Sequence, residues 1–125
     1  MKQVMTLLAV MILLSNAIIA AEKPKEALSN TMTLSGTIID NLCAKAHKTS
    51  IESFIKTHTK ECALMPDCAA SGYSLYHYGA LIPFDNESSQ KIEQFLKIKD
   101  SSLNVTVVVE KAAGDTYSLI SIRNQ

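Results

Sequence analysis

Residues 103–122, LNVTVVVEKAAGDTYSLISI, hold the clearest structural signal of this 125-residue chain. Apolar residues occupy every second position from Leu103 to Val109, which is the pattern of a strand with one buried face. Ala113-Gly114-Asp115 is a turn sequence. Alternation resumes from Tyr117 to Ile122. The segment therefore predicts two consecutive strands joined by a turn.

Further strands are expected upstream of this pair. Residues 32–39 alternate in the same way and end at Asp40-Asn41. Residues 73–84 predict a hairpin that turns at Gly79. Between the hairpin and the last two strands, residues 85–99 begin with capping side chains and continue with a helical apolar stripe.

Residues 49–64 carry the pattern of another helix. Thr49 and Glu52 fit a capping box. Hydrophobic residues, a histidine and a cysteine then recur at helical spacing on one face, namely Ile51, Phe54, Ile55, His58 and Cys62. We therefore expect one helix that ends near Met65-Pro66, with His58 and Cys62 pointing into the domain.

The order of these elements predicts an α+β domain that is mainly β. Five short strands with a helix between the third and fourth match a small OB-like barrel. An open antiparallel sheet is the alternative. In both cases the Cys/His-bearing helical segment is an insertion after strand 1. The length allows one domain, which we place at residues 32–125.

The N-terminus has the layout of a secretory signal peptide. Lys2 precedes an apolar run over residues 4–14, and small residues follow at Ala17, Ala20 and Ala21. The run is short for a membrane span, which needs about 20 residues. We therefore expect a signal peptide at 1–20, a flexible leader at 21–31, and a periplasmic or secreted protein without a membrane anchor after cleavage.

Charge and motifs exclude several function classes. The chain has 12 basic and 12 acidic residues and no basic run, which argues against a nucleic-acid partner. It contains no P-loop, G-x-G-x-x-G or G-x-S-x-G motif. We expect a binding module with a protein or small-ligand partner in the periplasm, and not an enzyme.

A cluster of cysteines and histidines is the main chemical signal. It comprises two pairs with i, i+4 spacing and one further cysteine, namely Cys43, His47, His58, Cys62 and Cys68. Residues four apart on a helix share a face, so that each pair could bind one ion. Such nitrogen and sulfur ligands suit zinc, and soft thiolates also suit copper(I). The cluster therefore predicts a metal site.

A disulfide is the alternative interpretation, because export places the cysteines in an oxidising compartment. Three cysteines allow one pair and leave one thiol, and the sequence does not determine which two of Cys43, Cys62 and Cys68 would pair. The disulfide would then stabilise an interaction domain with neither metal nor catalysis. A catalytic Cys62 with His58 has weaker support, since the pair is not a recognised nucleophile arrangement.

Three short motifs also resemble a group of small exported bacterial proteins of unknown function. They are Gly36-x-Ile38-x-Asp40-x-x-Cys43, His58-x3-Cys62 and Cys68-x3-Gly72. The resemblance covers roughly residues 32–125. It implies export and a small OB-like barrel, but no reaction.

The predicted elements also imply how the site is assembled. Cys43 closely follows the first strand, so the end of that strand limits its reach. We expect Cys43 to lie close to Cys62 or Cys68, with His58 buried beside them. Burial there favours neutral imidazole, which is the form that binds a metal.

Overall fold

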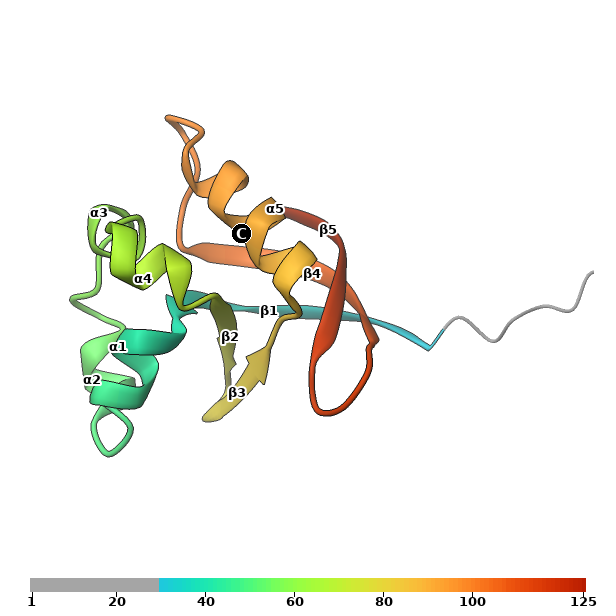
Figure 1. Cartoon of the computed structure of the whole chain (residues 1–125), viewed down its shortest axis with the longest axis horizontal. Helices are drawn as coiled ribbons and strands as arrows, with labels where there is room; N and C mark the ends of the chain where they lie inside the picture. The colour runs from blue at the N-terminus through green and yellow to red at the C-terminus, as the bar shows by residue number, and fades with distance from the viewer. Residues whose placement is uncertain (1–29) are drawn as a thin grey trace, which may run out of the picture.

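Five antiparallel strands form one curved sheet in the computed structural model, which describes residues 30–125 (Figure 1). In chain order the elements are β1 (Thr31–Asp40), α1 (Asn41–Ala46), α2 (Ile51–Phe54), α3 (Lys60–Ala63), α4 (Pro66–Ala70), β2 (Tyr73–His77), β3 (Ala80–Pro83), α5 (Asn86–Leu96), β4 (Asn104–Lys111) and β5 (Tyr117–Asn124). The fold is thus α+β and mainly β, as predicted. The predicted signal peptide, and all of the leader except its last two residues, lie outside the described residues.

The strands are arranged in the order β3-β2-β1-β4-β5. Strand β1 is central, because its first half pairs with β4 and its last residues pair with β2. The two edge strands approach each other at a single parallel bridge between Phe84 and Tyr117. One bridge does not close the sheet. The open antiparallel sheet, which was the alternative to a barrel, is therefore the architecture of this domain.

The β2–β3 hairpin forms as the sequence predicts. His77 and Ala80 are its last paired residues, so Tyr78 and Gly79 make a two-residue turn. Both have positive φ, 45° and 86°, which is the backbone of a type I′ turn. Pro83 lies on edge strand β3, where its missing amide donor costs no sheet hydrogen bond.

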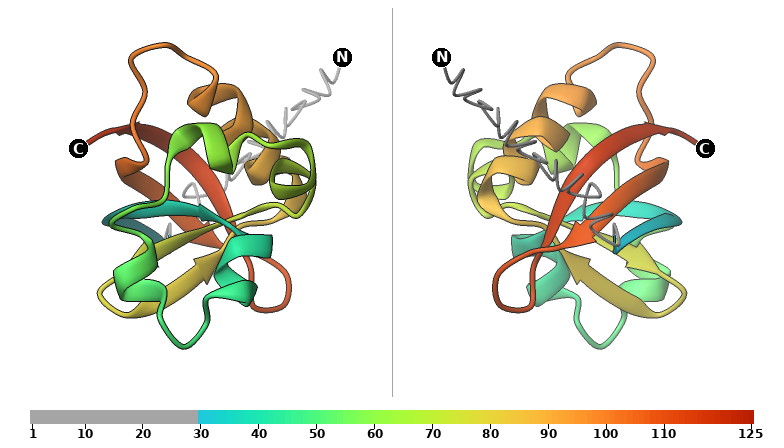
Figure 2. Two further views of the ribbon diagram at one scale, coloured as in Figure 1. Left: turned by 90° about the vertical axis from the view of Figure 1, so that its left-hand side faces the viewer. Right: turned by 90° about the vertical axis from the view of Figure 1, so that its right-hand side faces the viewer.

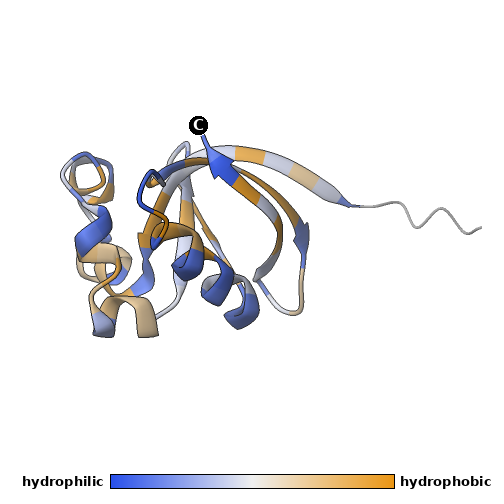
Figure 3. Ribbon diagram, turned by 90° about the horizontal axis from the view of Figure 1, so that it is seen from above, coloured by the Kyte–Doolittle hydropathy of each residue, from blue (hydrophilic) through white to orange (hydrophobic). Residues whose placement is uncertain are grey.

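Helix α5 packs against the sheet and completes the hydrophobic core. Asp85 caps the helix, with its side chain accepting a hydrogen bond from the Ser88 amide. In Figure 3 the curved sheet arches over this helix, and hydrophobic residues, drawn in orange, recur along its strands. The buried core side chains are Ile38, Ala63, Tyr73, Leu75, Phe84, Ile92, Leu96, Val105, Val107, Val109 and Leu119.

Helices α1 to α4 lie together at one end of the sheet, between β1 and β2 in the chain (Figures 1 and 2). We call residues 41–72 the helical insertion. Its place after strand 1 is as predicted. No helix among residues 30–125 combines the length and the apolar character needed to span a membrane.

The prediction of a single helix over residues 49–64 is wrong. The chain instead forms α2 and α3, separated by residues 55–59. The Thr57 hydroxyl donates to the Phe54 carbonyl at 3.1 Å, and the Thr59 hydroxyl accepts from the Cys62 amide at 3.2 Å. Threonine side chains that bond to the backbone compete with helix formation in this way.

The predicted capping box does not form either. The residue before α2 is Ser50, and its side chain makes no capping hydrogen bond. Downstream, Met65 is extended, with ψ of 143°, and Pro66 begins α4. This agrees with the expectation that the residue before proline avoids the α region.

Candidate metal centre

Asp40 is the last residue of β1 and is completely buried. Its Oδ1 accepts a hydrogen bond from the Cys43 amide at 2.8 Å, so the carboxylate caps α1. Because Cys43 lies in the first turn of that helix, the same bond fixes the start of the helix and the position of the thiol. The other carboxylate oxygen, Oδ2, takes no part in the cap and can contact a second group.

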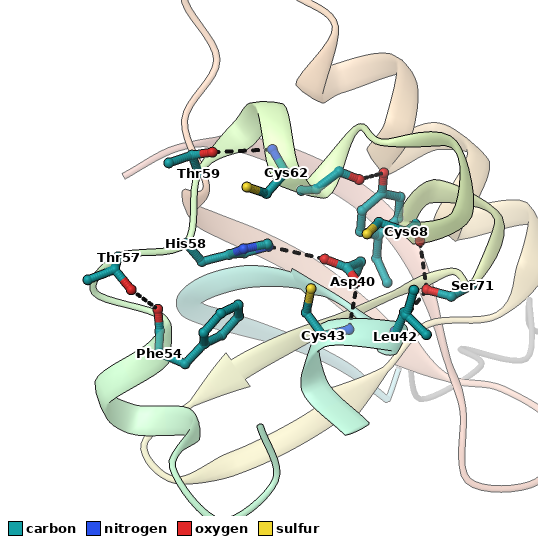
Figure 4. A network of polar contacts seen from close by, with 12 residues as sticks. Asp40, Leu42, Cys43, Phe54, Thr57, His58, Thr59, Cys62, Cys68 and Ser71 are labelled. Atoms are coloured by element: carbon teal, nitrogen blue, oxygen red, sulfur yellow. Dashed lines mark hydrogen bonds and ion pairs between the residues drawn. The ribbon is translucent and has the colours of Figure 1, made fainter. Parts of the chain in front are cut away.

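His58 comes from the short linker between α2 and α3 and faces Asp40 (Figure 4). Its backbone amide donates to the Phe54 carbonyl at 2.9 Å. Its Nε2 lies 3.1 Å from Asp40 Oδ2. Only 8% of His58 is exposed, which agrees with its predicted inward orientation. Neither Asp40 Oδ2 nor either ring nitrogen makes a hydrogen bond, which is unusual for buried polar atoms.

The ring of Phe54 packs against the His58 ring and also stacks on His47. The rings of Phe54 and His58 are tilted, with centroids 5.0 Å apart. On its other side Phe54 stacks on His47, with centroids 3.7 Å apart and planes within 9°. His47 therefore packs on Phe54 and is not one of the three donors of the site.

The junction between α4 and β2 brings Cys68 to the same place. The Asn41 amide donates to the Gly72 carbonyl at 2.9 Å, and the Leu42 amide donates to Ser71 Oγ at 3.0 Å. Ser71 Oγ in turn donates to the Cys68 carbonyl at 2.6 Å. These bonds tie the start of α1 to the end of α4. Cys68 is thereby buried beside the site.

Asp40, Cys43 and His58 together form a group that could hold a metal ion. Their carboxylate oxygen, thiol sulfur and ring nitrogen all lie within 4.8 Å of one another. Zinc bonds measure about 2.0–2.3 Å, so the three donor atoms would have to draw closer together to bind one ion. Oxygen, nitrogen and sulfur are all zinc ligands.

Burial sets the protonation of the group in the absence of an ion. Burial, followed by the nearby Asp40 carboxylate, raises the pKa of the Cys43 thiol to about 12. Burial also raises the pKa of Cys68, with further increases from Asp40. It lowers the pKa of His58, although the Asp40 charge acts in the opposite direction. At neutral pH the imidazole and both thiols are therefore uncharged.

The five cysteine and histidine residues singled out in the sequence have different positions. Cys43 and His58 are brought together, and Cys68 lies close enough to affect the pKa of Cys43. His47 stacks on Phe54. Cys62 is exposed, so its predicted inward orientation is wrong. Because the expected helix breaks at residues 55–59, Cys62 no longer shares a face with Ile51 and Phe54.

Sequence reasoning did not include Asp40 in the site. It treated Asp40 as the end of the first strand and as part of the motif that resembles exported bacterial proteins, but not as a ligand. A usable signal was present, since the carboxylate stands three residues before Cys43 at a predicted strand end. Such a residue is well placed to cap the following helix.

All three cysteines lie in the described part of the chain, and all three are free thiols. No protein-family model matches the chain, and no curated protein or solved structure shows significant similarity to it. The resemblance to exported bacterial proteins therefore stays a prediction.

Proposed function

We propose that this protein is a small exported metal-binding module that holds one ion through Asp40, Cys43 and His58. The observation that carries the proposal is the convergence of three different donor atoms at a buried point. Asp40 and Cys43 are neighbours where β1 passes into α1, and the fold brings His58 to them from the α2–α3 linker.

The unused polar atoms support this proposal. Asp40 Oδ2 and His58 Nε2 lie 3.1 Å apart, are buried, and have no polar partner except each other, and His58 Nδ1 has none. Leaving a buried polar atom without a partner costs about 1–3 kcal/mol. An ion between them would provide both atoms with a strong partner.

Zinc is the metal that these donors favour. Copper(I) prefers soft sulfur ligands, whereas this group includes a carboxylate oxygen. The neutral imidazole of His58 is ready to bind, and the Cys43 thiol would lose its proton to the metal. Copper remains the alternative to be measured alongside zinc.

Metal analysis of the purified protein tests the proposal. We expect about one equivalent of zinc per chain. Cys43→Ser and His58→Ala should reduce this to less than about one tenth of an equivalent. Cys62→Ser, which removes the exposed thiol, should leave the metal content unchanged. A metal content below a tenth of an equivalent in the parent protein would overturn the proposal.

A Cys43–Cys68 disulfide is the second candidate, because the two thiols interact and belong to neighbouring helices. It would make the protein a disulfide-stabilised interaction domain without metal. Counting thiols after denaturation and metal removal separates the two candidates. Three free thiols support the metal site, whereas one supports the disulfide.

The proposal also includes export and binding without catalysis. Export rests on the signal-peptide pattern of residues 1–20 and on the resemblance to exported bacterial proteins. A cleaved N-terminus at or near Glu22 in protein recovered from a periplasmic extract would support it. The intact N-terminus in a cytoplasmic fraction would contradict it.

A further inference from the structure

The helical insertion, residues 41–72, has almost no hydrophobic core of its own. The structure buries four of its residues, and these are Ala44, His58, Ala63 and Cys68. Two are alanines, which bury little apolar area, and the other two carry polar or metal-binding atoms. The large aliphatic residues of the core lie instead in the sheet and α5.

The helices of the insertion are also too short to be stable by themselves. They contain six, four, four and five residues. Isolated helices shorter than about 12–15 residues are marginal in water. Their order must therefore come from contacts with other parts of the chain.

The two ends of the insertion do have such contacts. Asn41 bonds to Ser71 and Ser74. Near the other end, the buried Tyr73 hydroxyl donates to the Ala63 carbonyl at 2.8 Å. Residues 43–58 lie between these anchors, and both ends of that stretch contact Asp40, through the Cys43 amide and the His58 ring.

Cys68 lies beside the site but outside the group of three donor atoms that are within 4.8 Å of one another. It is 7% exposed and lies on α4, next to Cys43 of α1. Structural zinc sites are almost always four-coordinate, with all four ligands supplied by protein. Asp40, Cys43 and His58 supply three, and Cys68 is the buried thiol that remains.

We infer that Cys68 is the fourth ligand of a structural zinc ion, and that this ion takes the place of a hydrophobic core in the helical insertion. The inference rests on the proposed metal-binding function. The sheet and α5 fold without the ion, whereas residues 43–58 become ordered only when it binds. The four ligands then join β1, α1, the α2–α3 linker and α4 at one point.

Hydrogen exchange of the purified protein tests the effect on folding. With free zinc at 100 times its Kd, mass action should slow exchange in peptides covering 43–58 by about 100-fold relative to chelator-treated protein. Peptides covering β4 and β5 should exchange at the same rate in both samples. Zinc binding without added protection of 43–58, or with equal protection of the sheet, would overturn the inference while leaving the proposed function intact.

Replacement of Cys68 tests its assignment as a ligand. Cys68→Ser should bind zinc at least about tenfold more weakly than Cys62→Ser. With cobalt in place of zinc, the sulfur-to-metal absorption of Cys68→Ser should fall by about half, as expected when two thiolate ligands become one. Equal affinity and equal absorption in the two variants would refute the assignment.

Two controls distinguish the loss of a zinc ligand in Cys68→Ser from unfolding of that variant. Sheet amide protection, measured in the same exchange experiment, reports whether Cys68→Ser is folded, and Cys68→Ala provides a second variant of small size. Absence of zinc binding to the parent protein would overturn the proposed function and this inference together.

Discussion

His58 Nε2 lies 3.1 Å from Asp40 Oδ2, and both side chains are buried at the end of β1. The contact has the distance of an ion pair but not its charge, because burial lowers the pKa of His58 and keeps the ring neutral. A buried carboxylate facing a neutral imidazole lacks a cation. This relationship defines the first prediction.

Replacing Asp40 with asparagine should strongly weaken metal binding and leave the sheet and α5 folded. An asparagine oxygen can still cap α1 by accepting from the Cys43 amide, but it no longer brings a negative charge to the ion. We expect zinc affinity to fall by at least about 100-fold, measured by competition with a coloured chelator. Asp67→Asn, at an exposed position of α4, is the matched control and should keep parental affinity.

Lys60 makes an anchoring contact independent of the metal site. Its ammonium group donates to the carbonyl oxygens of Ile98, Lys99 and Ser101 at 2.9–3.1 Å. The contact joins α3 to the loop between α5 and β4. The Lys60 side chain therefore connects the helical insertion to the loop that leads from α5 into β4.

Lys60→Met should destabilise the protein by about 1–2 kcal/mol, since hydrogen bonds to a charged group are lost while the side-chain length is kept. Urea denaturation measures the change. Lys56→Met, at an exposed position of the same segment, should stay within about 0.5 kcal/mol of the parent. Equal effects of the two substitutions would show that the carbonyl contacts contribute nothing.

Gly36 stands where β1 passes close to β2. A Cβ added there would collide with the Tyr76 carbonyl oxygen and touch the Leu75 side chain. Because the obstacle is backbone, neither strand can yield without losing sheet hydrogen bonds. Gly36→Ala should therefore cost about 3 kcal/mol or more of unfolding free energy.

Gly79→Ala provides the comparison for that substitution in a thermal or urea melt. Its Cβ would enter open space, and only the positive φ of 86° opposes it. The expected cost is about 1 kcal/mol. A Gly36→Ala variant as stable as Gly79→Ala would contradict the close approach of the two strands.

The sheet was predictable because its signal is local. Alternation from Leu103 to Val109 corresponds to β4, whose residues Val105, Val107 and Val109 are completely buried. The β2–β3 turn follows equally from Gly79. What local alternation does not determine is closure, since this depends on how closely the distant edge residues Phe84 and Tyr117 approach.

The candidate site was predictable only in part, for a physical reason. Periodicity correctly indicated that His58 points inward, but it extended the helix through Thr57 and Thr59, whose hydroxyls bond to the backbone instead. Cys62 was consequently given the wrong orientation. The carboxylate of Asp40 reaches Cys43 through a local cap that the three-residue spacing could have indicated, but it reaches His58 only through the tertiary fold.

Asp85 provides the pH-dependent prediction, at a position far from the metal ligands in the chain. Its carboxylate accepts hydrogen bonds from the Ser118 hydroxyl and the Ser88 amide. These bonds, with that of Ser118 contributing most, hold the pKa of Asp85 below its ordinary value. The folded state therefore favours the ionised form more than the unfolded state does.

The stabilisation from this charge is fully present above the unfolded-state pKa, which is about 3.9 for aspartate. It is lost as the pH falls through the lower pKa of the folded state. Asp85→Asn keeps a cap for α5 but carries no charge, so it isolates this contribution. We expect the parent to be more stable than Asp85→Asn by a constant margin from about pH 7 to pH 5, and the margin to shrink as the pH falls below about 4.

Urea denaturation across this pH range measures the margin, with chelator in every sample so that metal release at low pH has no effect. Titration of the other carboxylates cancels in the difference between the two proteins. Asp85→Ala, which removes the cap as well, should cost about 1 kcal/mol more than Asp85→Asn, and this extra cost should not depend on pH. A margin between parent and Asp85→Asn that stayed constant down to pH 2 would mean that the serine hydrogen bonds do not favour the ionised carboxylate.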